Sequence, residues 1–123
     1  MGNRYGKVLV TGGTGVLGMG FQAIRDELGD REFTFIDSSA CDLTVLKDVK
    51  ELVGDLAPEA LIHLAAMSGG VRLSIDRPAT LLRDNVIMNM NVLEAARAGD
   101  VGKTVMTLSS GMYSEDAPMP FRE

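Results

Sequence analysis

The sequence has a single cysteine, Cys41, so no disulfide can form within its 123 residues. It has no basic run, low-complexity tract or internal repeat, and its formal net charge of −5 argues against non-specific binding to nucleic acid. It also lacks a signal segment and any apolar stretch near the roughly 20 residues that span a bilayer. These absences favour a reducing compartment. We expect a cytoplasmic protein with no membrane, nucleic-acid or metal partner.

What the sequence does contain is a regular alternation of apolar runs and helical patterns. β-Branched and apolar runs predict strands over residues 7–11, 32–37, 60–66 and 103–110. Helical spacing of apolar residues predicts helices over residues 16–30, 44–57 and 78–99. This alternation builds a mostly parallel sheet with right-handed crossovers and helices on both faces, so the predicted fold class is α/β.

The ends and faces of these helices carry further expectations. Thr44 is a candidate N-cap of the second helix. Pro78 suits the first turn of the third helix, which carries an apolar stripe typical of an amphipathic helix. The members of that stripe are Leu82, Val86, Met90 and Leu93. Residues 111–123 have a turn-like composition and no clear period.

Glycine is concentrated between the first predicted strand and the first helix, in TGGTGVLG over residues 11–18. Gly12 permits a tight turn, Gly15 leaves room for a pyrophosphate, and Gly18 lets the helix pack closely on the strand. The helix N-terminus adds free N–H groups and the positive end of a dipole. This context predicts a dinucleotide-phosphate site. The alternative is a glycine-rich turn that binds no ligand.

An aspartate ends the second predicted strand. Asp37 follows Gly18 by 19 residues, where a carboxylate hydrogen-bonds the ribose 2′-hydroxyl of NAD and repels the 2′-phosphate of NADP. Asp37 therefore favours NAD. The alternative is an aspartate that caps a turn at the end of the strand.

Four motifs carry a resemblance to a known family: TGGTGVLG, the DL pair at 42–43, HLAA at 63–66 and LSSGMY at 108–113. With them the chain resembles the extended short-chain dehydrogenase/reductase family of sugar-nucleotide epimerases, dehydratases and reductases, also described as NAD-dependent epimerases/dehydratases. The likeness is closest to its GDP-L-fucose synthase branch. It implies a Rossmann-type doubly wound sheet, of which residues 1–123 would be the N-terminal, NAD(P)-binding part with about four strands. The C-terminal substrate-binding part would be absent.

The resemblance also assigns site residues. Ser109 would be the catalytic serine, which donates a hydrogen bond to the substrate oxygen. The cofactor, NAD or NADP, would contact the glycine loop, the Asp42-Leu43 pair beside the adenine, and the end of the third strand. Together with Asp37, the cofactor-binding residues are then Gly12, Thr14, Gly15, Val16, Leu17, Gly18, Asp37, Asp42, Leu43, Ala65, Ala66 and Met67. The branch generally uses NADPH, which opposes the preference for NAD that Asp37 indicates.

Other polar residues near these motifs have a structural interpretation. His63 lies in an apolar run, so we expect a hydrogen-bonded core histidine and not an acid or base. Asn85, Asn89 and Asn91 recur along the third predicted helix. Asn85 either braces neighbouring loops or belongs, like the others, to an exposed helix face.

The family's reaction requires a Tyr-x-x-x-Lys pair, in which the lysine lowers the pKa of the proton-transferring tyrosine. Tyr5 is followed four residues later by Leu9, and Tyr113 by Ala117, so neither tyrosine forms the pair. We therefore expect a cofactor-binding part of a sugar-nucleotide epimerase/reductase that is inactive alone. The alternatives are a non-catalytic dinucleotide-binding module, serving as redox sensor or partner subunit, and a structural domain without ligand.

The partners follow from the same reasoning. A dinucleotide is the expected ligand, and a nucleotide sugar would bind only with a C-terminal part supplied. The strand predicted over 103–110 is apolar and would be a sheet edge, with unpaired backbone groups. We therefore expect a homo-oligomer or pairing with a complementing chain.

Overall fold

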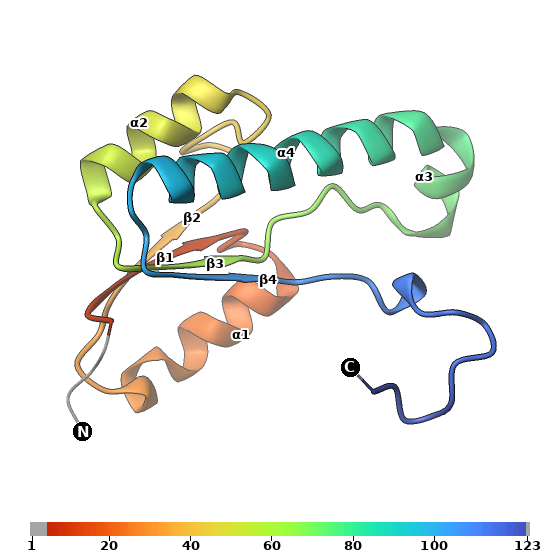
Figure 1. Cartoon of the computed structure of the whole chain (residues 1–123), viewed down its shortest axis with the longest axis horizontal. Coiled ribbons are helices and arrows are strands. Elements are labelled where there is room, and N and C mark those ends of the chain that lie inside the picture. Colours follow the sequence, from red (N-terminus) through yellow and green to blue (C-terminus); the bar gives the residue numbers. More distant parts are fainter. Residues whose placement is uncertain (1–4, 123) are drawn as a thin grey trace.

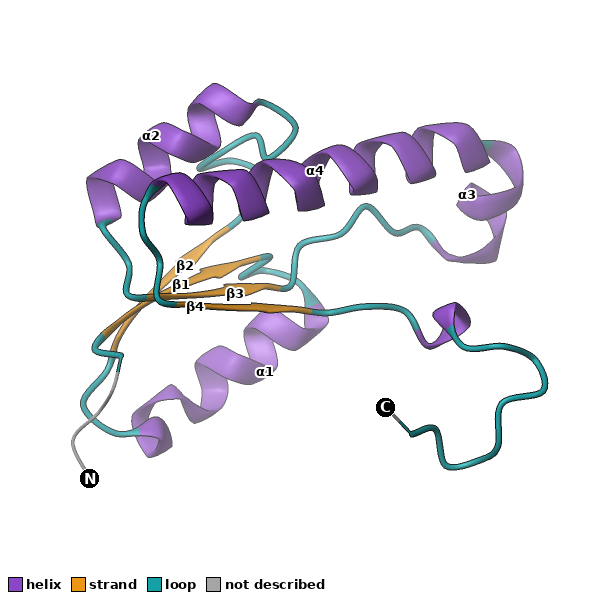
Figure 2. Ribbon diagram, in the orientation of Figure 1, coloured by secondary structure: helices purple, strands orange, loops and turns teal. Residues whose placement is uncertain are grey.

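The structure, a computed structural model, describes residues 5–122 and contains a parallel sheet between two layers of helices (Figures 1 and 2). The strands are β1 (Lys7–Thr11), β2 (Glu32–Ile36), β3 (Ala60–His63) and β4 (Lys103–Met106). The helices are α1 (Val16–Ile24), α2 (Leu46–Leu56), α3 (Gly70–Asp76) and α4 (Pro78–Ala98), with 3₁₀ turns at Arg25–Leu28 and Ser110–Met112. The predicted order is present, and α3 is an addition to it.

The sheet has the strand order β2-β1-β3-β4, and all neighbouring strands are parallel. β1 is central, since Leu9 pairs with Thr34 on one side and with Leu61 on the other. Figure 1 shows α2 and α4 on one face of the sheet and α1 on the opposite face. The chain moves from β1 to one neighbour and then crosses to the other, so the strand order reverses beside β1. This arrangement confirms the predicted doubly wound α/β fold.

Alternating side chains of β1 supply the core on both faces of the sheet. Leu9 packs in a buried cluster with Val49 and Val53, which α2 contributes from its apolar face. Val8 and Val10 belong to a second cluster on the α1 side. Burial on both faces explains why residues 8–10 are apolar in succession, without polar alternation.

Two strands end earlier than the apolar pattern predicts. β3 stops at His63 and β4 at Met106, whereas the predicted strands continue to residues 66 and 110. Beyond β3, residues 64–67 leave the sheet and line a pocket instead. Their apolar character therefore reflects the lining of a cavity rather than strand pairing.

The predicted N-cap at Thr44 is wrong. α2 begins at Leu46, and its N-cap residue, Val45, has no capping side chain. The Thr44 side chain turns back instead, since its hydroxyl and its backbone N–H both donate to Asp42 Oδ1, at 2.7 and 2.9 Å. The Thr44 hydroxyl thus bonds to the Asp42 side chain and not to the N–H groups at the start of α2.

The apolar stripe of α4 does not pack in the core of the described residues. The four side chains of the stripe are largely exposed: Leu82 by 69%, Val86 by 49%, Met90 by 63% and Leu93 by 45%. The buried side of α4 presents Val92, Ala95 and Ala96, and contacts α2. Among residues 5–122 no helix, α4 included, is long and apolar enough to cross a membrane.

Candidate functional site

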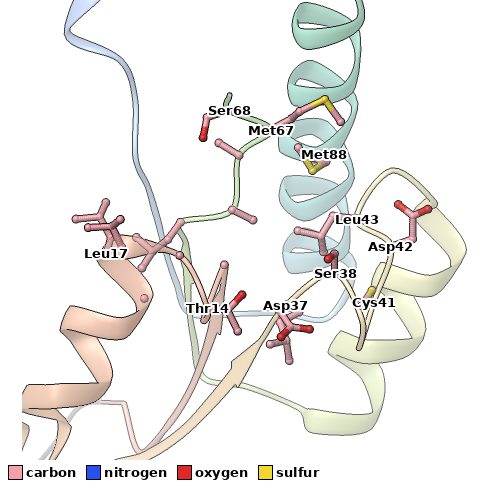
Figure 3. Close-up of a pocket in the computed structure, with 18 residues that line it drawn as sticks. Thr14, Leu17, Asp37, Ser38, Cys41, Asp42, Leu43, Met67, Ser68 and Met88 are labelled. Atoms are coloured by element: carbon pink, nitrogen blue, oxygen red, sulfur yellow. The ribbon is translucent and has the colours of Figure 1, made fainter. Parts of the chain in front are cut away.

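A pocket of about 610 Å³ opens where the loops after β1, β2 and β3 meet, at the carboxyl ends of these strands. Ligands of open α/β sheets bind at this position, beside the point where the strand order reverses. Figure 3 shows Leu17 on one side of the pocket and Leu43 and Met88 on the other. The lining includes every cofactor-binding residue that the sequence predicts, namely Gly12, Thr14, Gly15, Val16, Leu17, Gly18, Asp37, Asp42, Leu43, Ala65, Ala66 and Met67.

Gly12 and Gly18 shape the glycine loop because neither position has room for a side chain. Gly12 adopts a φ of +72°, and a Cβ there would lie 2.7 Å from the backbone nitrogen of Ala65. A Cβ on Gly18 would lie 2.2 Å from the carbonyl oxygen of Gly12. The first turn of α1 therefore lies directly against the loop, and the loop lies directly against the chain that follows β3.

Gly15 differs from these two glycines, because its conformation is ordinary and a Cβ there would meet a single close atom. It is the N-cap of α1 with φ −75°, and a Cβ there would meet only the Gly12 carbonyl oxygen, at 3.3 Å. The N–H groups of a first helical turn have no partner within the helix. The first turn here has no acidic residue, and Val16, Leu17 and Gly18 line the pocket. The pocket therefore holds the donor end of a helix, which suits a phosphate.

Two carboxylates border the pocket after β2, and each is held by its own local turn. Asp37 Oδ1 accepts hydrogen bonds from the N–H and the hydroxyl of Ser39, at 2.9 and 2.6 Å. These bonds lower the pKa of Asp37, and the corresponding bonds from Thr44 lower the pKa of Asp42. Both groups are therefore negatively charged at neutral pH. The described residues that line the pocket include no lysine or arginine.

Asparagines of α4 hold the remaining walls of the pocket. The Asn85 side chain makes two hydrogen bonds to the backbone of Met67. Its Oδ1 accepts from the Met67 N–H at 2.8 Å, and its Nδ2 donates to the Met67 carbonyl at 3.0 Å. Asn91 Nδ2 donates to the carbonyl of Leu43 at 2.9 Å. The bracing role considered for Asn85 is confirmed, and Asn91 braces a second loop.

Comparison with protein families matches residues 8–123 to the family described as "NAD dependent epimerase/dehydratase family". The chain belongs to this family. The resemblance predicted from the motifs is thereby confirmed. The predicted cofactor class, NAD or NADP, is confirmed at the level of the family.

Two curated relatives show how far the likeness extends. A probable GDP-L-fucose synthase of Drosophila melanogaster is 36% identical over 119 residues, which are 95% of this chain and 37% of that protein. A GDP-L-colitose synthase of Yersinia pseudotuberculosis is 32% identical over 110 residues, 89% of this chain and 35% of that protein. The chain thus spans little more than a third of the length of these relatives.

Solved structures agree with the family assignment. A GDP-L-fucose synthetase from Naegleria fowleri bound to NADP has a TM-score of 0.80 at 28% identity, over 99% of this chain and 36% of that chain. The UDP-glucose 4-epimerase of Thermus thermophilus, in complex with NAD, has a TM-score of 0.71 at 24% identity, over 89% and 42%. At that identity the second match shows the fold alone. The Rossmann-type fold is confirmed.

Ser109, which the family resemblance makes the catalytic serine, lies outside this pocket. It is exposed, it precedes the 3₁₀ turn Ser110–Met112, and its Oγ accepts a hydrogen bond from the Gly111 N–H at 3.1 Å. Tyr113 stacks on Phe121 with ring centroids 4.4 Å apart. The catalytic role of Ser109 in this family member remains a prediction.

The structure also adds pocket residues that the sequence reasoning missed: Ile36, Ser38, Cys41, Leu64, Ser68 and Met88. Each of them except Met88 is next in sequence to a predicted site residue, so adjacency in the sequence could have suggested it. Cys41 is buried, and burial raises the pKa of its thiol. Met88 comes from α4, and nothing in the motifs pointed to it. Among residues 5–122 no cluster of three acidic, histidine or cysteine residues is arranged to hold a metal ion.

Proposed function

We propose that this chain is the NAD(P)-binding part of a sugar-nucleotide epimerase/reductase similar to GDP-L-fucose synthase. The observation that supports this is the convergence, on one pocket, of all the residues that the sequence predicted for cofactor binding. The family assignment and the named relatives agree with it. The substrate and the activity of the longer relatives are carried over only as part of this proposal.

The residues present fit a dinucleotide. The pyrophosphate would lie against the loop of residues 12–18, where Gly15 leaves space and the first turn of α1 supplies N–H donors. Asp37 would accept the ribose hydroxyls, and Asp42 and Leu43 would border the adenine. Ala65, Ala66 and Met67 would line the opposite wall of the cleft. When bound, the nicotinamide would supply hydride chemistry.

Proton transfer is the part of the reaction that this chain does not supply. Ser109 could hold a substrate oxygen by a hydrogen bond, but a serine does not replace a tyrosine whose pKa is lowered toward the working pH. The 123 residues contain no Tyr-x-x-x-Lys pair. We therefore propose that these residues bind the cofactor and show negligible turnover by themselves.

The same missing pair supports a second candidate, a non-catalytic dinucleotide-binding module. The genomic reading frame distinguishes the two candidates. A Tyr-x-x-x-Lys pair encoded downstream of residue 123 would support the enzyme. A stop codon there, with a stable protein in cells, would support the module.

Calorimetric titration with NADH and NADPH tests cofactor binding, with Gly15→Ala as the informative variant. The new methyl group would occupy the space left for the pyrophosphate, so we expect the affinity to fall by about tenfold or more. Gly20→Ala is the matched control, since a Cβ at Gly20 meets nothing within 4 Å. It should bind as the wild type does. A folded wild type that binds neither coenzyme would refute the proposal.

A further inference from the structure

His63 is the only histidine of the sequence, and its side chain is 1% exposed. It ends β3, directly before the residues that line the pocket wall. Its Nδ1 lies 2.7 Å from the hydroxyl of Thr11 on β1, and its Nε2 lies 3.0 Å from Asn89 Oδ1 on α4. The ring thus connects the long helix to the strand that leads into the glycine loop.

The partners determine where the protons lie. The Asn89 amide oxygen can only accept, so His63 donates from Nε2. In a neutral imidazole the other nitrogen then accepts, and Thr11 donates its hydroxyl proton to Nδ1. With its proton directed to the ring, Thr11 Oγ1 accepts the backbone N–H of Ala65 at 3.3 Å. The direction of every bond in the series is therefore fixed.

The last bond of the series acts on the pocket. Ala65 lines the pocket. The distance from its backbone nitrogen to a Cβ added at Gly12 would be 2.7 Å. Gly12 directly follows Thr11 in the chain. The glycine loop and the wall after β3 thus approach each other at Gly12 and Ala65, next to the hydrogen bond between Thr11 and the Ala65 amide.

We propose that Asn89, His63 and Thr11 form a positioning relay that fixes the Ala65 amide against the glycine loop and so sets the shape of the cofactor pocket. The proposal rests on the proposed function, since it names residues that prepare the same site. None of the three side chains needs to touch the cofactor. Their effect is to hold the backbone of one wall in a single position.

Thr11→Val removes the hydroxyl with little change in shape, and Thr11→Ser retains it. We expect the Kd for NADH to rise about five- to tenfold in Thr11→Val, because both hydrogen bonds of the Thr11 hydroxyl, to His63 and to the Ala65 amide, are lost. In Thr11→Ser the Kd should stay within about twofold. Val53→Ala is the control for lost stability, because Val53 is buried in α2 and does not line the pocket. It should lower the melting temperature and leave the Kd unchanged.

Two measurements without cofactor separate this proposal from the proposed function. Long-range proton–nitrogen NMR should show His63 protonated at Nε2 and not at Nδ1, and hydrogen exchange at the Ala65 amide should accelerate in Thr11→Val. If Thr11→Val does not fold, Asn89→Leu, which removes the acceptor of His63, and the neutral, acceptor-retaining Asn89→Gln provide the same comparison. A proton on Nδ1, or unchanged Ala65 exchange with unchanged Kd, would overturn the relay. Failure of the wild type to bind either coenzyme would overturn only the proposed function.

Discussion

The contact between the first turn of α1 and the glycine loop makes a sharp prediction for Gly18→Ala. An added Cβ would lie 2.2 Å from the carbonyl oxygen of Gly12, 2.6 Å from that of Gly13 and 2.7 Å from the Gly13 carbonyl carbon. All three are backbone atoms, so no side chain can rotate away to relieve the contact. The helix or the loop would have to move by about 1 Å to restore an ordinary carbon–oxygen separation of about 3.3 Å.

The change in the free energy of unfolding of Gly18→Ala is the difference between two opposing effects. Overpacking of a closely packed site destabilises by about 1–3 kcal/mol, and rigid backbone neighbours place this site at the upper end. Alanine in place of glycine recovers about 0.5–1 kcal/mol by restricting the unfolded chain. We therefore expect Gly18→Ala to lower the free energy of unfolding by about 2 kcal/mol.

Urea denaturation followed by circular dichroism measures this change, and Gly20→Ala provides the control on the same helix. Gly20 is exposed with open space around it, so its replacement should raise the free energy of unfolding by about 0.5–1 kcal/mol. The two substitutions are chemically identical and should have opposite signs. If Gly18→Ala were as stable as the wild type, α1 would not lie against the loop as described.

The remaining predictions concern charge. Burial lowers the pKa of His63 from 6.5, so the unfolded chain binds a proton at a higher pH than the folded chain does. The free energy of unfolding should be fully retained above pH 6.5 and should fall as the pH decreases toward the folded-state pKa of His63. The slope should be at most about 1.4 kcal/mol per pH unit. Urea titrations measure this dependence, and an unfolding free energy that stays constant below pH 6.5 would contradict it. Asp37→Ala should raise the affinity for NADPH relative to that for NADH by about tenfold, because one like charge facing the 2′-phosphate is lost. Asp55→Ala, on the exposed side of α2, should leave the ratio of the two dissociation constants unchanged.

The parts of the fold that the sequence predicts best are those set by local pattern. The run over residues 7–11 is short and rich in valine, which favours a strand covered on both faces, and its bounds agree with β1 to the residue. Gly12 and Gly18 occupy positions where the structure excludes a Cβ, which is the physical reason that their spacing is diagnostic. The pocket follows from these features because the carboxyl ends of parallel strands share one edge of the sheet.

The errors arise where two local interactions compete or where a helix has two usable faces. Thr44 could cap α2 or join the Asp42 turn, and no sequence rule ranks these alternatives. In α4 the apolar stripe suggested one orientation, but the helix turns Asn85 and Asn91 toward the pocket loops and leaves Leu82 exposed. Loop bracing was one of two roles open for Asn85 in the sequence, and only the position of the Met67 backbone decides between them.

The side-chain hydrogen bonds of the pocket walls differ in range from the one that Ser109 makes. The pocket walls are joined by bonds between distant segments, such as those from Asn85 to Met67 and from Asn91 to Leu43. Ser109, by contrast, has only a local side-chain bond, to Gly111, among the described residues, and β4 before it pairs on one side with β3. A wall held by long-range bonds is prepared before any ligand arrives. The absence of a comparable long-range side-chain bond at Ser109, among the described residues, supports our proposal that these residues bind the cofactor and do not transfer a proton.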